Sequence, residues 1–236
     1  MISRFVSWYR NFRGRYVVQQ RRKHEYIMNR YYAHLIDPFF TKFVYDLKLS
    51  PNVVTIIAGF LGVGAGISFL LQEWILGAIL LQLHHFMDGA DGNLARLTNK
   101  VSNFGAKLDQ IVDQIVRFVL FLSIAYVADV SIWLKVLFVL TIYLDIFIVH
   151  RFVLPFVQKY GLVRAKWKQW FLSKGIIPAF DIFLVYFLIS IFAIVGNLEL
   201  LVYIVIIGKN MDWLYRIWEC LKTKYFLDKE RKAHGE

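Results

Sequence analysis

Six apolar blocks, each about as long as a membrane-spanning helix, constrain this chain more than any other feature. A helix needs about 20 apolar residues to cross the hydrocarbon core of a bilayer, and lipid admits only backbone whose hydrogen bonds are satisfied internally. The chain is 58% hydrophobic and only 19% charged, which argues against a soluble protein. The sequence predicts an all-α, polytopic integral membrane protein with six transmembrane helices, at residues 52–71, 74–95, 106–128, 131–154, 176–196 and 198–218.

The basic residues flank alternate ends of these predicted helices. Of the 28 Lys and Arg residues, 25 lie in segments 1–50, 96–107, 151–174 and 216–236. The other connections, near 72–74, 127–130 and 196–199, contain no Lys or Arg. Because cytoplasmic loops carry such an excess, we expect both termini to face the cytoplasm. This distribution accounts for the net charge of +11 without a nucleic-acid partner.

The charge pattern divides the chain into three parts. Residues 1–48 mix aromatic and basic side chains, which is typical of an amphipathic helix in the lipid headgroup layer; a mobile basic tail is the alternative. Residues 49–218 form the predicted six-helix transmembrane domain, and residues 219–236 form a basic cytoplasmic tail. The segment 156–175 is the longest interior polar connection and is a candidate for a short interfacial helix.

The first predicted span has a clear start and an unusual glycine content. Ser50 precedes Pro51, which is the order expected of a helix cap followed by the first helical position. Inside the span lie Gly59, Gly62, Gly64 and Gly66, which would allow another helix to approach closely.

Four carboxylates lie at the ends of the second and third spans. Asp88 and Asp91 are three residues apart and Asp109 and Asp113 four apart, so each pair shares one helix face. Buried carboxylates need a counter-charge, and an oxygen-rich cage suits hard divalent cations. No Cys and His pair has zinc spacing, so we expect Mg²⁺ or Mn²⁺ at a cytoplasmic membrane surface.

Three residues between the carboxylates suit a nucleotide diphosphate. Gly92 would let the backbone approach phosphates, and Arg96 offers a planar guanidinium for phosphate oxygens. Gly105 lets the turn before the third span tighten, whether or not it also contacts phosphate. His84 and His85 lie one turn before Asp88, where a bond to a metal-binding carboxylate and simple packing are both open interpretations.

The full pattern is Asp88-x2-Asp91-Gly92-x2-Ala95-Arg96-x8-Gly105-x3-Asp109-x3-Asp113, and it resembles the signature of the CDP-alcohol phosphotransferases. The resemblance implies displacement at the β-phosphorus of a CDP-alcohol by another alcohol, with release of CMP. It implies two metal ions on Asp88, Asp91, Asp109 and Asp113, with Asp113 also the catalytic base. Asn52 and Thr55 match a PNxxT element near the nucleotide, so they join Asp91, Gly92, Arg96 and Gly105 as candidate nucleotide or phosphate contacts.

The resemblance says less about the substrates. The run FGAKLDQIVDQIV is closer to bacterial and archaeal types, which implies a plasma membrane, a CDP-linked lipid donor such as CDP-diacylglycerol, and a small polar alcohol acceptor. The reverse assignment, with the lipid as acceptor, stays open. Arg117, Arg151 and Arg164 are candidate acceptor contacts, together with Lys166 and Lys168. Arg117 also lies one turn beyond Asp113 on the same helix face, so we expect the two to pair. A homodimer is expected from the resemblance alone.

The polar residues of the later spans have interpretations other than substrate binding. Lys209, Asp212 and Arg216 share one face of the sixth span, where ion pairing among themselves is as good an explanation as a ligand. Asp145, His150 and Asp181 are further polar residues in the spans.

A divalent-cation transporter would need carboxylates accessible from both membrane faces, and an arginine in the path would repel the ion. An inactive scaffold is disfavoured because every motif position is occupied.

Overall fold

The computed structural model of the chain describes residues 2–17 and 24–234, which are almost entirely helical. This confirms the all-α prediction. The helices are α1 Ile2–Tyr16, α2 His34–Asp46, α3 Pro51–Leu70, α4 Trp74–Leu97, α5 Asn103–Val127, α6 Ile132–Ile148, α7 Leu154–Tyr160, α8 Lys166–Ser173, α9 Ile182–Val195 and α10 Leu198–His234. Two π-helical turns, η1 Asn29–Ala33 and η2 Val149–Val153, and two short strands, β1 Glu25–Tyr26 and β2 Ile176–Ile177, complete the described elements.

Among the described residues, three stretches of helix are long and apolar enough to cross a membrane: Pro51–Leu70, Asn103–Val127 and Ile132–Tyr160. The predicted span at 176–196 is wrong at its start, because residues 176–177 form β2 and helix α9 begins only at Ile182. Its 14 residues extend about 21 Å, less than the roughly 30 Å of a bilayer core. Helix α10 continues without a break past residue 218. The count of six spans therefore stays a prediction.

Helix α3 packs against α5 through its glycines. Ser50 caps α3 by accepting a hydrogen bond from the backbone N–H of Val53, as the sequence predicts. Methyl groups added at Gly59, Gly62 and Gly66 would lie only 2.6, 2.5 and 2.7 Å from valine side chains of α5, at Val112, Val116 and Val119. The predicted close helix approach is confirmed. It holds the start of α3 beside the start of α5.

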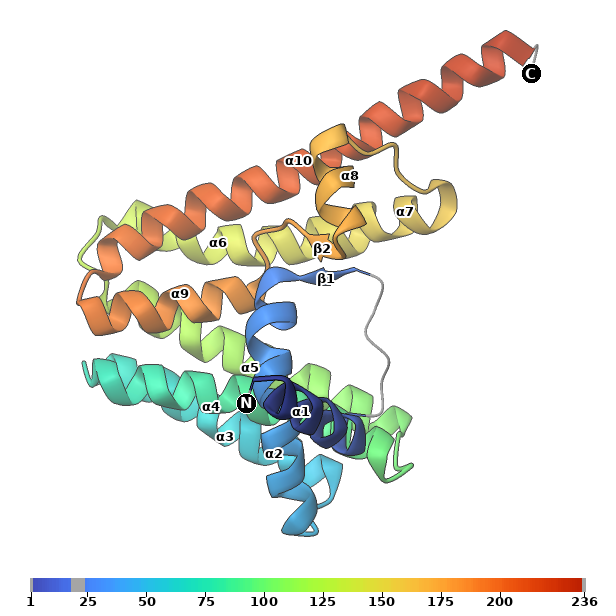
Figure 1. The fold of residues 1–236 in the computed structure, drawn as a ribbon. Helices are drawn as coiled ribbons and strands as arrows, with labels where there is room; N and C mark the ends of the chain where they lie inside the picture. Colours follow the sequence, from blue (N-terminus) through green and yellow to red (C-terminus); the bar gives the residue numbers. More distant parts are fainter. Residues whose placement is uncertain (1, 18–23, 235–236) are drawn as a thin grey trace.

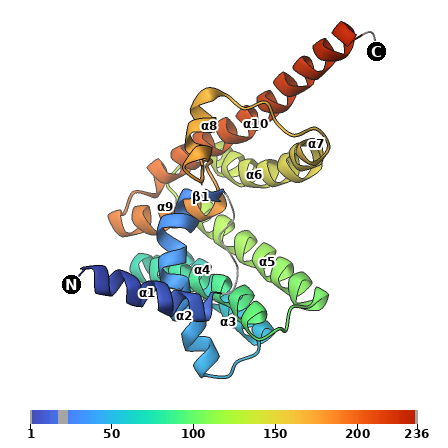
Figure 2. The same cartoon turned by 45° about the vertical axis from the view of Figure 1, so that its right-hand side comes forward.

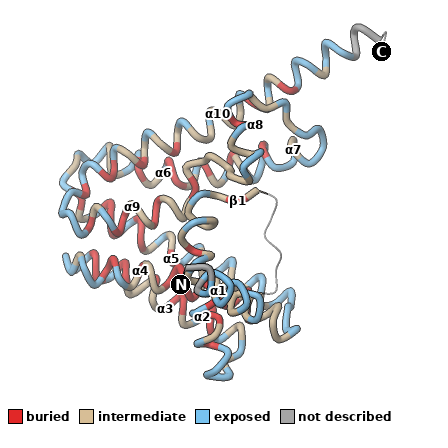
Figure 3. Tube along the Cα trace, viewed as in Figure 1, coloured by how far each residue is buried: buried red, intermediate tan, exposed pale blue. Residues whose placement is uncertain are grey.

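The helices form two groups joined by one apolar core. In Figure 1, α3 and α4 lie at one end of the molecule and α6, α9 and α10 at the other, with α5 running between the groups. Figure 3 shows the buried residues along the facing sides of these helices. The largest core cluster takes side chains from all six helices, including Phe69, Leu81, Phe121, Phe138, Ile189 and Leu201.

The N-terminal segment lies against the α4 side of the molecule (Figure 2). Helix α1 packs on α2 through aromatic rings, with Phe12 4.9 Å from Phe39 between ring centres. Strand β1 pairs in parallel with β2, and the Arg30 guanidinium donates a 2.8 Å hydrogen bond to the carbonyl of Gly175. Part of the 1–48 prediction, at residue 1 and residues 18–23, lies outside the described residues. The headgroup position of α1 stays a prediction.

The basic connection between α6 and α9 is held against the C-terminal helix. Lys168 of α8 forms a 2.5 Å ion pair with Glu219 of α10, and both side chains are buried. The backbone N–H of Val163 also donates to the hydroxyl of Thr223. Beyond Thr223, α10 extends past the other helices (Figure 1). Residues 235–236 of the predicted tail lie outside the described part of the chain.

Candidate active site

Helices α4 and α5 bring three of the four predicted metal ligands together. Asp88, Asp91 and Asp109 each place a carboxylate oxygen within 4.8 Å of the others, and Asp91 is buried. Carboxylates this close repel one another unless a cation lies among them. The set contains only hard oxygen donors, which Mg²⁺ and Mn²⁺ prefer. These residues fit the divalent metal that the sequence predicts.

A residue of α3 completes this junction. The hydroxyl of Thr55 donates a 2.5 Å hydrogen bond to Oδ2 of Asp91. Thr55 lies one turn inside α3, and the glycine contacts described above hold that turn against α5. Hydrogen bonds from outside the metal shell fix how a carboxylate presents its other oxygen. Thr55 therefore orients Asp91, and its predicted contact with the nucleotide stays a prediction.

Asp113 lies one turn beyond Asp109 and has a different partner. Its Oδ2 is 2.6 Å from a guanidinium nitrogen of Arg117, on the same face of α5. The predicted pairing of these two residues is confirmed. Asp113 is not one of the three clustered carboxylates, so its assignment as a metal ligand stays a prediction. Arg117 fixes the Asp113 carboxylate in the structure, and its predicted contact with the acceptor stays a prediction.

The predicted phosphate contacts lie at the ends of the same helices. The Arg96 guanidinium donates a 2.9 Å hydrogen bond to the side-chain oxygen of Asn93, and it lies close enough to Gly92 that an added methyl group there would be 3.4 Å away. Gly105 lies at the start of α5, where a methyl group would be 3.0 Å from the side-chain oxygen of Asn52. Asn52 and Gly105 therefore bring the starts of α3 and α5 together.

The two neighbouring histidines have different environments. Nδ1 of His84 lies 2.9 Å from the carbonyl of Ala58 in α3, so His84 is a packing contact between helices. His85 is also buried, and its ring lies 4.8 Å from that of Phe183. Neither ring nitrogen of His85 has a hydrogen-bond partner in the part of the chain that the structure describes.

The remaining predicted cations are not gathered at the carboxylates. Arg151 is exposed and lies over the ring of Phe152, and Arg164 forms no ion pair among the described residues. Lys209 pairs with Asp145 at 2.7 Å instead of with residues of its own helix, whereas Arg216 pairs with Asp212 as expected. The geometry therefore does not single out Arg151 or Arg164 as acceptor contacts.

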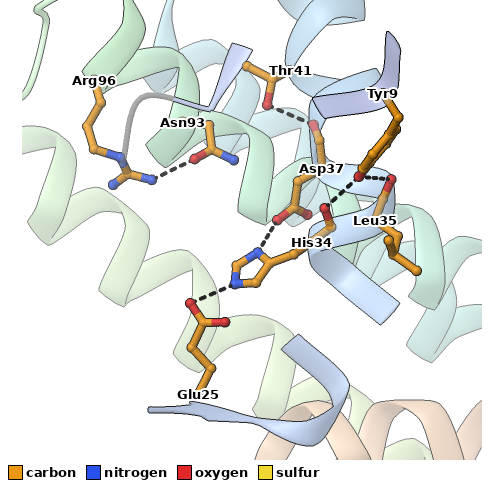
Figure 4. Close-up of polar contacts among 8 residues, drawn as sticks. All are labelled: Tyr9, Glu25, His34, Leu35, Asp37, Thr41, Asn93 and Arg96. Carbon is orange, nitrogen blue, oxygen red and sulfur yellow. Dashed lines mark hydrogen bonds and ion pairs between the residues drawn. The ribbon is translucent and has the colours of Figure 1, made fainter. Parts of the chain in front are cut away.

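A cavity of about 420 Å³ opens beside Asp88, on the side of α4 that faces the N-terminal segment. In its wall, His34 lies between two carboxylates, 2.9 Å from Asp37 and 3.4 Å from Glu25 (Figure 4). Sequence reasoning missed these residues because it assigned segment 1–48 to the membrane surface. One signal was available: His34 and Asp37 lie three apart within an otherwise apolar stretch.

Comparison with known proteins agrees with the motif. The family model described as CDP-alcohol phosphatidyltransferase matches residues 48–207. This match covers more than half of the chain and begins after the N-terminal segment. It confirms the resemblance drawn from the motif.

Individual relatives match shorter stretches. The chain is 43% identical over 70 residues to an archaetidylinositol phosphate synthase of Pyrococcus horikoshii, which is 30% of this chain and 37% of that protein. It is 36% identical over 74 residues to a CDP-diacylglycerol–serine O-phosphatidyltransferase of Helicobacter pylori, which is 29% of each protein. The matches thus span less than half the length of these relatives.

The fold is similar to that of a solved enzyme. The structure of Mycobacterium tuberculosis phosphatidylinositol phosphate synthase with manganese and citrate gives a TM-score of 0.55, with 17% identity, over 79% of this chain and 89% of that one. The structure of the same enzyme with CDP-DAG bound gives 0.54, with 18% identity, over 78% and 92%. At this level of identity the likeness establishes the fold.

Proposed function

The chain belongs to the CDP-alcohol phosphatidyltransferase family, and on that premise we propose that it transfers a phosphatidyl-type group from a CDP-linked lipid to a small polar alcohol, with release of CMP. One observation carries the proposal. Asp88, Asp91 and Asp109 converge from two helices within 4.8 Å, and Gly92 and Arg96 follow Asp91 on α4. A metal-binding cluster beside a guanidinium suits a diphosphate better than a bare cation.

The metal would be held by Asp88, Asp91 and Asp109, and Asp113 would share a second ion. When bound, such ions neutralise diphosphate oxygens and stabilise the departing CMP. The ions are Mg²⁺ or Mn²⁺, and the support for metal use is the donor set itself together with the manganese complex of the mycobacterial enzyme.

The protein residues supply binding and proton transfer. Arg96 binds phosphate oxygens, and Gly92 leaves room for the diphosphate to approach α4. The acceptor oxygen attacks the β-phosphorus, the bond from that phosphorus to the CMP oxygen breaks, and the hydroxyl proton passes to the Asp113 carboxylate. The ion pair with Arg117 keeps that carboxylate oriented before the acceptor arrives. Asn52 and Thr55 hold the α3 side of the nucleotide site.

The choice of a lipid donor has separate support. The mycobacterial enzyme with this fold was solved with CDP-DAG bound, and the two sequence relatives are named for inositol phosphate and serine products. We therefore place the lipid on the CDP side. We further propose six membrane spans, a homodimer, and a site that faces the cytoplasm of a bacterial or archaeal plasma membrane.

The test is CMP release by purified protein in lipid vesicles. The assay supplies CDP-diacylglycerol, Mn²⁺ or Mg²⁺, and in turn serine, myo-inositol 1-phosphate and glycerol 3-phosphate. CMP should appear only when metal and a suitable alcohol are both present. Absence of CMP with every acceptor, accompanied by Mn²⁺ uptake into the vesicles, would favour a cation transporter instead.

Two variants test the assigned roles. Asp113→Asn should abolish turnover because it removes the proton acceptor, and Asp88→Asn should weaken both activity and metal dependence. Asp129→Asn is the matched control, because Asp129 is exposed just beyond the opposite end of α5. Full activity in either test variant would contradict its role.

A further inference from the structure

The cavity beside Asp88 has an outer wall that lies mostly outside the family match. The match begins at residue 48. Most of this wall comes from α1, β1, η1 and α2, which all precede that residue, and Ile177 and Phe183 complete the lining from within the match. Its volume of about 420 Å³ lies within the range of small-molecule sites. This part of the molecule is therefore where the chain can differ from other members in what it binds.

The inner wall is one stripe of α4. His85, Asp88, Gly89, Asn93 and Arg96 line the cavity, and their spacing places them along one side of the helix. Asp88 lies at the edge of this stripe and also belongs to the carboxylate cluster. A molecule in the cavity therefore lies next to the cluster.

His85 lacks the partner that a buried polar group normally has. His85 is only 6% exposed, and both of its ring nitrogens are without hydrogen bonds among the described residues. Leaving buried donors and acceptors unsatisfied is destabilising, so such groups are rare in folded proteins. Asn29, on the opposite wall, has a buried side-chain oxygen in the same condition. A bound molecule with hydrogen-bonding groups would satisfy both.

The charges of the wall indicate what kind of molecule fits. His34 is held between Asp37 and Glu25, and Arg96 is bonded to Asn93 (Figure 4). The lining thus contains both carboxylates and basic side chains, so a phosphate would lie near carboxylates and an ammonium group near a guanidinium group. An acyl chain would strip water from these groups without replacing its hydrogen bonds. Hydroxyl groups both donate and accept, and they suit every position of such a wall.

We propose that this cavity binds the hydroxyl groups of a polyol acceptor, and that His85 is a specificity-determining residue that hydrogen-bonds one of them. The inference rests on the proposed function and narrows its acceptor from any small polar alcohol to a polyhydroxylated one. Gly89 contributes by letting α2 approach, since a methyl group there would lie 3.1 Å from a carboxylate oxygen of Asp37. The N-terminal segment thereby becomes part of the acceptor site.

The kinetic test uses His85→Phe, which keeps an aromatic ring against Phe183 and removes both nitrogens. Loss of one hydrogen bond should raise the KM for the polyol acceptor about tenfold, while the KM for CDP-diacylglycerol stays within twofold. Asn29→Ala should act in the same direction from the other wall. His150→Phe is the matched control, because His150 is exposed and bonds only within its own helix. An unchanged acceptor KM, or a raised donor KM, would overturn the proposal.

A binding measurement separates this inference from the proposed reaction. Thermal unfolding of detergent-solubilised protein is followed with myo-inositol, with serine or with glycerol 3-phosphate, all without CDP-diacylglycerol. Myo-inositol should raise the unfolding temperature of the wild type more than that of His85→Phe, a comparison that removes general polyol stabilisation. Equal shifts in both proteins, or a difference seen with serine alone, would refute the polyol site even if CMP release is observed. Absence of CMP with every acceptor would refute the reaction.

Discussion

A substitution at Gly59 of α3 tests directly whether the packing of α3 against α5 positions the carboxylates. A methyl group there would lie 2.6 Å from Cγ1 of Val112, whereas carbon atoms in contact are about 3.5–4.0 Å apart. Gly59→Ala must therefore move α3 and α5 apart by about 1 Å. Val112 lies between Asp109 and Asp113, so the shift acts directly on the site.

This shift should lower both the stability of the protein against unfolding and the rate of CMP release. Overfilling a packed contact typically costs about 1–3 kcal/mol, and a misplacement of about 1 Å in a catalytic site can cost on the order of a hundredfold in rate. We expect Gly59→Ala to unfold at lower temperature in detergent micelles and to release CMP about ten- to a hundredfold more slowly. Adding Val112→Ala should restore most of both losses, because it removes the methyl groups that collide.

Gly64→Ala provides the matched control in the same helix. A methyl group at Gly64 would lie 3.6 Å from Leu80, which is an ordinary contact. Replacing a helical glycine by alanine there should stabilise the protein by roughly 0.5–1 kcal/mol and leave the rate unchanged. If Gly59→Ala and Gly64→Ala behave alike, or if Val112→Ala gives no rescue, close approach of α3 and α5 does not position the site.

Two further predictions follow from single contacts. Thr55→Val keeps the side-chain shape but removes the hydrogen bond to Asp91, so the Mn²⁺ concentration for half-maximal CMP release should rise about tenfold, while Thr55→Ser should stay near wild type. Lys168→Met leaves the buried carboxylate of Glu219 unpaired and should cost about 3–5 kcal/mol of unfolding free energy. Adding Glu219→Met should recover most of that loss in thermal unfolding, and no recovery would argue against the pair.

Local rules explain why much of the site was predictable from sequence. The intervals in the motif fix which side chains share a helix face, so the meeting of Asp88, Asp91 and Asp109 needs only that the end of α4 and the start of α5 lie beside the same helix, α3. Ser50 as a cap and the pairing of Asp113 with Arg117 depend on neighbours within one turn. Such contacts depend only on residues that are close in the sequence, so they can be predicted from it.

Features that depend on distant segments were not predictable in this way. Lys209 of α10 pairs with Asp145 of α6 rather than with Asp212 of its own helix. Lys168 of α8 pairs with Glu219 of α10. Hydropathy alone extended the fifth span back to residue 176, although residues 176–177 pair with β1. The wall containing Glu25, His34 and Asp37 likewise exists only because the N-terminal segment folds back onto α4.

Two sides of helix α4 have different roles in the proposed reaction, one in the chemistry and one in binding the acceptor. Its Asp91 side faces Thr55 and the carboxylate cluster, within the residues that the family match covers. Its His85 side faces a wall that comes mostly from residues before the match. The relatives match this chain over only 70 and 74 residues and are named for different products. The shared motif can therefore fix the reaction while leaving the acceptor to be set by the N-terminal wall. Exchanging that wall between family members should change the acceptor without changing the metal dependence of CMP release.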